Sequence, residues 1–180
     1  RKIIHVVGTG TIGEPLIGLL CDFQDQLGID EITFHKNSAL NSDHSKVVGL
    51  INRGGRLCVD SNKVDDFKAL DLDPDFETEE AIKRATVVID CTPRGIGHKN
   101  KEKYYHKFMK SCKGFLAQGS ESGFGKKYAR RINDATLNSD DQFIQIVSCN
   151  THNLCCITHT LALDGDHDNL EEGRFVCIRR

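Results

Sequence analysis

A short run of glycines is the first feature of this sequence that could carry chemistry. It has the spacing Gly-x-Gly-x-x-Gly and comprises Gly8, Thr9, Gly10, Thr11, Ile12 and Gly13. An apolar segment, 2–7, precedes it and a helical pattern follows. A strand, a glycine turn and a helix in this order present backbone N–H groups and the positive end of the helix dipole to a phosphate. The run therefore predicts a dinucleotide-binding turn, and the alternative is a glycine-rich turn without a ligand.

The end of the second expected strand bears on which dinucleotide would bind. Sites for NAD usually place a carboxylate about 20 residues after the glycines, on the ribose 2′-hydroxyl. Here residues 35–37 read His-Lys-Asn and hold no carboxylate. The cation of Lys36 suits a 2′-phosphate better, so the sequence favours NADP and leaves NAD open. The alternative is a solvated loop lysine.

A second candidate for chemistry is the thiol of Cys149. It stands between an apolar segment, 143–147, and a helical pattern, 153–163. Backbone N–H groups at a helix start stabilise a thiolate, so the position fits a nucleophile as well as a buried structural cysteine. Cys155 and Cys156 lie inside the helical pattern, where we expect them to pack in the core. None of the eight cysteines forms a Cys-x-x-Cys pair, and we expect no metal site.

These candidates need elements that bring them together. Short apolar segments alternate with helical patterns, which predicts a parallel sheet with helices on both faces, an α/β Rossmann-type doubly wound fold. The expected strands are 2–7, 32–35, 56–59, 86–90, 115–118 and 143–147, and the expected helices are 12–23, 37–53, 79–84, 99–110 and 153–163. Ligands bind at the carboxyl ends of such strands. The loop 91–97 follows a strand, so it should line the cofactor cleft or serve as a plain turn.

Composition excludes several classes of function. The chain has 180 residues, 24 basic and 26 acidic, and 38% are hydrophobic. A net charge of −2 gives no general reason to bind nucleic acid. No segment approaches the ~20 apolar residues of a membrane helix. The cysteines are best explained as reduced thiols in a cytoplasmic protein.

The length suggests one domain and the start of another. We expect residues 1–148 to form the NAD(P)-binding domain and residues 149–180 to begin a catalytic, α+β substrate domain that is incomplete here. The segment 174–178 is expected to be a strand, and a lone helix and strand cannot close a domain.

Four motifs together resemble archaeal-type (type II) glyceraldehyde-3-phosphate dehydrogenases. They are the glycine run at 8–13, Asp-Cys-Thr-Pro-Arg-Gly-Ile-Gly-His-Lys-Asn at 90–100, Gln-Gly-Ser-Glu at 118–121 and Val-Ser-Cys-Asn-Thr-His-Asn-Leu-Cys at 147–155. They occur in the family's order, and the resemblance extends to the Arg-Arg pair at 179–180.

The resemblance implies a homotetramer that oxidises glyceraldehyde-3-phosphate with phosphate, reversibly, in glycolysis and gluconeogenesis. Its partners would be that small aldehyde and phosphate, its cofactor NADP or NAD, and its nucleophile Cys149, which forms a thioester. The N–H of Cys149 or Asn150 could hold the oxyanion. Further cofactor-binding residues would be Lys36, Thr92, Pro93, Gly95, Gln118 and Gly119. Substrate or phosphate would meet Thr151, His152, Arg179 and Arg180.

The chain also departs from the family. His152 and Asn153 stand where the family usually has Thr-Gly, Cys156 stands where an arginine often follows, and Ser122 replaces a lysine. The family's catalytic histidine lies beyond residue 180, and His152 is a weaker candidate for the base. Two alternatives therefore stay open: a non-catalytic nucleotide-binding relative, and a semialdehyde dehydrogenase of similar mechanism.

Overall fold

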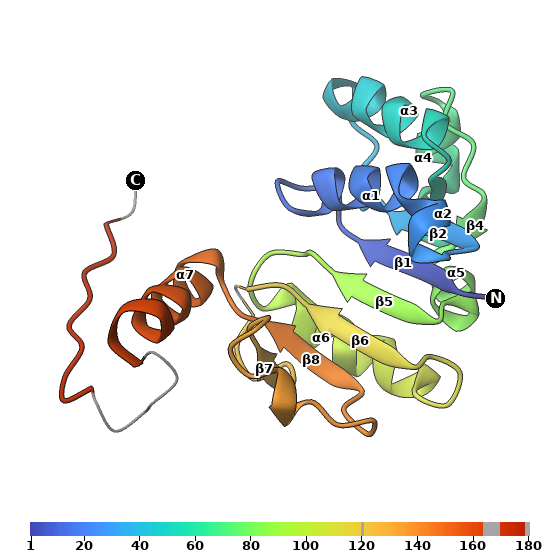
Figure 1. Cartoon of the computed structure of the whole chain (residues 1–180). Helices are drawn as coiled ribbons and strands as arrows, with labels where there is room; N and C mark the ends of the chain where they lie inside the picture. Colours follow the sequence, from blue (N-terminus) through green and yellow to red (C-terminus); the bar gives the residue numbers. More distant parts are fainter. Residues whose placement is uncertain (120, 164–169, 179–180) are drawn as a thin grey trace.

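The computed structural model describes residues 1–119, 121–163 and 170–178. Eight parallel strands form one sheet in the order β4-β3-β2-β1-β5-β6-β8-β7. The chain winds outward from β1 in one direction and then returns to continue from β5 in the other (Figure 1). The expected α/β Rossmann-type fold is confirmed.

The strands form where short apolar segments occur. They are β1 (Ile3–Val7), β2 (Glu31–His35), β3 (Arg56–Val59), β4 (Phe76–Glu77), β5 (Val87–Asp90), β6 (Gly114–Ala117), β7 (Lys126–Tyr128) and β8 (Phe143–Ile146). Every residue of β2 is buried, as expected for a central parallel strand covered on both faces. All six expected strands within 1–147 are present, and the two short ones, β4 and β7, were not expected.

Helices cover both faces of the sheet. They are α1 (Gly13–Asp22), α2 (Gln24–Leu27), α3 (His44–Asn52), α4 (Val64–Lys68), α5 (Thr78–Arg84), α6 (Ile96–Lys103) and α7 (Cys149–Thr158). Figure 1 shows α1 and α3 on one side of the sheet and α6 on the other. Two apolar cores result, because neighbouring residues of a strand point to opposite faces. Val6 packs in the core that holds Ile17 of α1, and Val7 in the core that holds Ile82 of α5.

A histidine is fully buried in the central strand. His5 of β1 is 0% exposed, and its Nδ1 lies 2.7 Å from Thr33 Oγ1 on β2. Burial, and to a lesser extent the neighbouring His35, lowers the pKa of His5 from 6.5 to about 3. The folded chain therefore holds a neutral imidazole at neutral pH.

This buried imidazole predicts acid sensitivity. Below about pH 6.5 His5 is protonated in the unfolded chain, but in the folded chain it stays neutral down to about pH 3. The free energy of unfolding therefore falls as the pH falls from about 6.5 to about 3. We expect His5 to remove about 3 kcal/mol of stability at pH 4. The His5→Gln variant should lose that part of the pH dependence in urea unfolding at pH 7 and 4. His106→Gln, at an exposed site, should retain it, and equal pH dependence in wild type and His5→Gln would contradict the assignment.

Several expectations about element bounds and burial are wrong. The segment 37–53 is helical only from His44, and the segment 99–110 divides into α6 and a 3-10 turn, Tyr105–Phe108. The segment 174–178 is not a strand, because none of the residues that the structure describes pairs with it. Three apolar side chains of the expected helix 12–23 are about half exposed: Ile12 (49%), Leu19 (54%) and Phe23 (45%). Ile17 and Cys21 are the buried apolar side chains of α1, and Leu16 and Leu20 pack partly buried against the same core.

Candidate cofactor cleft beside a helix-start cysteine

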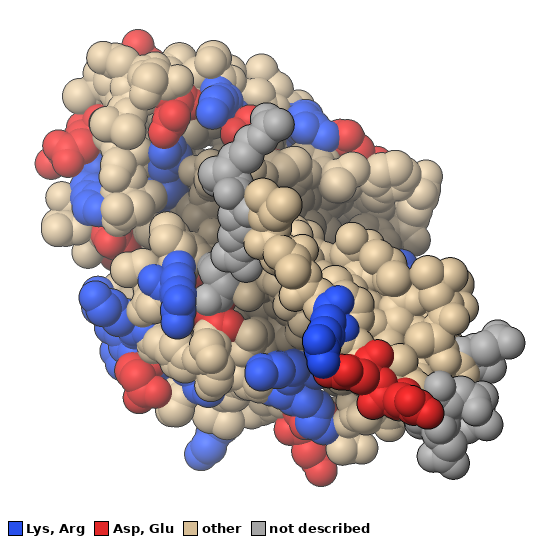
Figure 2. Space-filling view, turned by 90° about the vertical axis from the view of Figure 1, so that its left-hand side faces the viewer, with Lys and Arg blue, Asp and Glu red and all other residues tan. Residues whose placement is uncertain are grey.

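A cavity of about 870 Å³ opens at the carboxyl edge of the sheet. It lies over the ends of β1, β2 and β5, and Figure 2 shows this face of the molecule hollowed, with Lys and Arg side chains above and below the hollow. The structure brings many of the residues predicted for the cofactor to its wall: Gly8, Thr9, Gly10, Thr11, Ile12, Lys36, Thr92, Pro93 and Gln118. This is where ligands of parallel α/β sheets bind.

The glycine turn has the geometry of a phosphate cradle. Gly8 has φ +94°, a conformation that favours glycine, and its N–H donates to His35 O at 3.1 Å. A Cβ on Gly13 would overlap the carbonyl oxygen of Gly8, so α1 can approach β1 only with glycine there. A Cβ on Gly10 would meet nothing within 4 Å. The packing therefore explains Gly8 and Gly13 but leaves open space at Gly10.

A buried carboxylate holds the loop that forms the opposite wall. Asp90, the last residue of β5, is 2% exposed and accepts hydrogen bonds from both the N–H (2.9 Å) and the hydroxyl of Thr92. Its other oxygen accepts from Asn100 (2.9 Å) and from the hydroxyl of Tyr105 (2.6 Å). Burial, and then Asp90, raises the pKa of Tyr105, which stays a protonated donor. Asp90 thereby fixes Thr92 and α6 relative to the sheet.

A second buried carboxylate joins two loops at the cleft. Glu121, 2% exposed, accepts hydrogen bonds from the N–H groups of Gly95 and His98 (2.8 Å for His98). Gly95, at φ +84°, is the residue before α6, so Glu121 satisfies the N-terminal N–H groups of that helix. Gly95 does not line the cavity; it serves the turn that positions Pro93.

At the end of β2, two neighbouring side chains each contact an aspartate that lines the cavity. Lys36 Nζ lies 2.7 Å from Asp43 Oδ2, and His35 Nε2 lies 3.4 Å from Asp60 Oδ1. Asp60 also accepts a hydrogen bond from the Thr78 hydroxyl at 2.6 Å. The contact with His35, and after it the hydrogen bond from Thr78, hold the pKa of Asp60 far below its usual range despite partial burial. These groups line the cavity beside the carboxyl end of β2.

Cys149 does not line this cleft, but the residue before it packs against a loop that does. It is the first residue of α7 and is exposed, and Ser148 caps the helix by accepting from Thr151 N–H at 3.2 Å. Gln118 lines the cavity, and a Cβ on the next residue, Gly119, would lie 2.8 Å from the Cα of Ser148. The loop 118–119 therefore connects the cavity wall to the start of α7, and Gly119 itself packs against that start.

Of the remaining residues predicted to bind substrate, the structure describes three and leaves out two. Asn150, Thr151 and His152 follow Cys149 in the first turns of α7. His152 Nε2 lies 3.0 Å from the carbonyl oxygen of Arg130, so this nitrogen donates and cannot accept a proton from Cys149. Arg179 and Arg180 lie outside the described residues.

Burial of the other cysteines is mixed. Cys21, Cys58, Cys91 and Cys112 are buried. Burial, together with the neighbouring Asp90, raises the pKa of Cys91 to about 12, so this thiol at the cleft is unreactive. Cys156 is exposed and Cys155 half-buried, so the expectation that both pack in the core is wrong for Cys156. The described part of α7 contacts too little of the sheet to bury it.

Sequence reasoning missed the side chains that support the cleft. Asp90, Glu121, Asp43 and Asp60 were not singled out, although each carboxylate follows or closes an element at the carboxyl edge. The available signal was a charged residue inside or beside an apolar strand, as at Asp90, because such a group must find buried donors. Glu121 gave no such signal, since its partners are 23 and 26 residues away.

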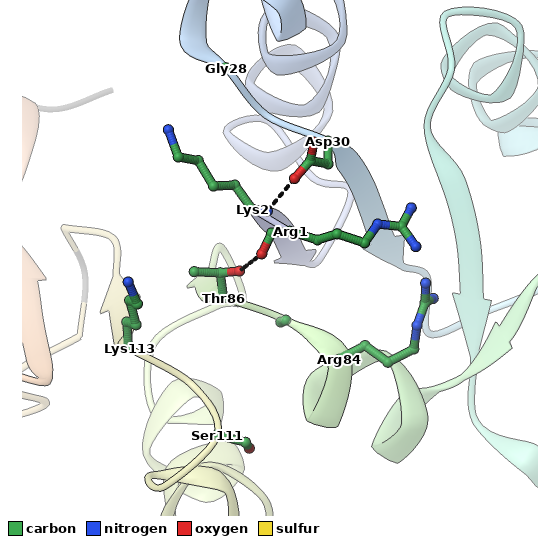
Figure 3. A pocket seen from close by; sticks show the side chains of 9 residues that line it. Arg1, Lys2, Gly28, Asp30, Arg84, Thr86, Ser111 and Lys113 are labelled. Carbon is green, nitrogen blue, oxygen red and sulfur yellow. Dashed lines mark hydrogen bonds between the residues drawn. The ribbon is translucent and has the colours of Figure 1, made fainter.

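A second hollow, of about 580 Å³, lies at the opposite edge of the sheet (Figure 3). Its polar groups bond one another: Lys2 N–H donates to Asp30, and the Thr86 hydroxyl donates to Arg1 O at 3.0 Å. Arg84 is held by Glu31 at 2.9 Å. Ligands of parallel sheets bind at the carboxyl edge, so the larger cavity is the candidate site.

No group of three or more His, Cys, Asp or Glu side chains is arranged to hold a metal ion within the described ranges. In the same ranges, no helix has the length and apolar character needed to cross a membrane.

Comparison with known proteins places the chain beside one group of enzymes. No model of a known protein family matches the chain. Its relatives include glyceraldehyde-3-phosphate dehydrogenases from Pyrobaculum arsenaticum (29% identical), Methanothermus fervidus (26%) and Methanobacterium formicicum (30%). The matches cover 98–99% of this chain but 48–50% of those relatives, so the chain spans about half their length. Over nearly its whole length, the chain resembles archaeal glyceraldehyde-3-phosphate dehydrogenases, as its motifs predicted.

Proposed function

We propose that the protein is an NAD(P)-dependent aldehyde dehydrogenase that oxidises glyceraldehyde-3-phosphate with inorganic phosphate. One observation carries the proposal: the glycine cradle, with open space at Gly10, adjoins through residues 118–119 a cysteine at the start of a helix. The relatives' names support the same reaction. The proposal extends to a cytoplasmic homotetramer with residues 1–148 as the cofactor domain and 149–180 as the start of the catalytic domain.

The residues of the cleft would hold the cofactor as follows. Gly8 to Gly13 bind the pyrophosphate, and Lys36 lies toward the adenosine. Thr92, Pro93 and Gln118 form the wall nearest α7. The bound cofactor supplies a hydride acceptor. The chain's own part is to fix it there and keep its reactive end next to Cys149.

Cys149 would perform the covalent chemistry. Its thiolate adds to the aldehyde carbon. In the first turn of α7, the N–H groups of Thr151 and His152 already donate to Ser148. The N–H groups of Cys149 and Asn150 are therefore the ones that would stabilise the resulting oxyanion. Loss of a hydride leaves a thioester on Cys149. A phosphate oxygen attacks the thioester carbon, and the acyl phosphate leaves as the thiolate reforms. Thr151 and the two arginines, 179 and 180, are proposed to hold the anionic groups.

Dinucleotide binding tests the cofactor half of this proposal. Gly10→Ala should leave thermal stability within about 1 kcal/mol, since the new methyl meets only open space, yet weaken dinucleotide binding about 100-fold by filling the phosphate site. Isothermal titration calorimetry with NAD and NADP on the full-length protein measures this. Gly49→Ala is the matched control, because Gly49 lies exposed in α3 with open space around it, away from the cavity. Equal weakening in both variants, or none in Gly10→Ala, would contradict the proposal.

A further inference from the structure

The ion pair between Lys36 and Asp43 lies within the cofactor cleft. Lys36 follows β2 directly, and its side chain is only 10% exposed. Its ammonium donates to Asp43 Oδ2 at 2.7 Å, and both residues line the cavity. Asp43 comes from a 3-10 turn, Asn41–Asp43, just before α3. The cation that the sequence offers to a 2′-phosphate is thus already neutralised.

The surrounding charges also balance. Lys46 Nζ lies 3.6 Å from Glu14 Oε2, and these two residues line a small cavity with Lys36, Asp43 and Thr9. The group holds two cations and two anions. A 2′-phosphate, with nearly two negative charges, would enter beside the Asp43 carboxylate, and these four side chains would offer it no surplus positive charge. Bringing an anion next to a partly buried carboxylate is unfavourable.

A ribose 2′-hydroxyl, unlike a 2′-phosphate, would bind favourably beside the Asp43 carboxylate. Asp43 is held in its ionised form, since the hydrogen bond from Lys36 and then the charges of Lys36 and Lys46 lower its pKa. An ionised carboxylate accepts a strong hydrogen bond from a hydroxyl. Dinucleotide folds usually supply this acceptor from the end of the second strand, where this chain has Lys36. Asp43 reaches the same region from the following turn.

We propose that Asp43 determines cofactor specificity: it accepts from the ribose 2′-hydroxyl, neutralises Lys36 and gives preference to NAD over NADP. This inference rests on the proposed function, because it concerns the same cleft. Without the Asp43 carboxylate, Lys36 becomes a free, largely buried cation that should favour a 2′-phosphate.

The test compares two ligand pairs on the full-length protein. Calorimetry gives Kd for NAD and NADP, and for 5′-AMP and adenosine 2′,5′-bisphosphate, which isolate the adenosine end. We expect wild type to prefer the ligands without a 2′-phosphate. In Asp43→Asn and Asp43→Ser, the ratio of affinities should move toward the 2′-phosphorylated ligands by about 10- to 100-fold. Lys36→Met in the Asp43→Asn background should reverse that shift.

Asp22→Asn is the matched control. It removes the same charge from another aspartate paired with a cation, Arg53, away from the cleft. A shift in the Asp43 variants alone supports the inference. An unchanged ratio, or an equal shift in Asp22→Asn, overturns it while leaving the proposed function intact. Failure of every ligand to bind wild type would overturn both, and the wild-type titration with NAD separates that outcome from the others.

Discussion

Replacing Cys149 by serine is expected to lower turnover of the full-length protein with glyceraldehyde-3-phosphate about a thousandfold or more. A serine hydroxyl ionises far less readily than a thiol, so serine is a much weaker nucleophile at the start of α7. NADH or NADPH formation with and without phosphate measures the effect. Dinucleotide affinity should stay unchanged, because Cys149 does not line the cavity.

The control for this substitution lies in the same helix. Cys156 is also exposed on α7 but lies two turns further along, so Cys156→Ser should turn over like wild type. Turnover retained in Cys149→Ser would require another nucleophile. A wild-type protein that binds the cofactor but oxidises no glyceraldehyde-3-phosphate would instead favour a semialdehyde substrate or a non-catalytic relative.

The second large effect is expected at Asp90. Asp90→Ala should lower the free energy of unfolding by about 3 to 5 kcal/mol, because it leaves Tyr105, Asn100 and Thr92 without their common acceptor. Tyr105 is 1% exposed, so water cannot replace that acceptor without opening the core. Urea unfolding measures the loss. Dinucleotide binding should also weaken, since Thr92 lines the cavity.

A graded series makes the Asp90 prediction sharper. Asp90→Asn keeps the shape and one accepting oxygen, so its loss should be smaller than that of alanine. Asp22→Ala removes an aspartate whose partner Arg53 is exposed to solvent, so its loss of stability should be much smaller than that of Asp90→Ala. Losses of similar size in Asp90→Ala and Asp22→Ala would show that the buried network contributes little.

The sequence predicted what depends on local pattern. Short apolar segments predicted the six main strands. The rule that ligands bind at the carboxyl ends of parallel strands predicted that Gly8, Lys36 and Thr92 line one cavity. The pattern failed where structure depends on partners distant in the chain. β7 is largely polar and forms only by pairing with β8, and β4 has two residues beside β3.

The support of the site was hidden for the same reason. A helical pattern in 99–110 says nothing about its start, which Glu121 fixes by accepting from residues 95 and 98. The pairing of Lys36 with Asp43 depends on how the segment 37–43 folds back toward β2. The helical pattern over 37–53 predicted an α-helix there, but the structure has a loop and a 3-10 turn before α3. Hydrophobic spacing reports neither kind of contact.

The carboxylate of Glu121 also restricts how this protein can change over evolutionary time. A methyl group on Gly97 would lie 2.9 Å from Glu121 Cγ and Oε2. Any larger residue at 97 must displace the side chain that satisfies the start of α6, and a shorter acid at 121 must give up that contact. Single substitutions at either position should therefore be selected against, whereas paired substitutions can survive. Positions 97 and 121 should co-vary among descendants of this sequence, and an engineer who redesigns the loop should mutate them together.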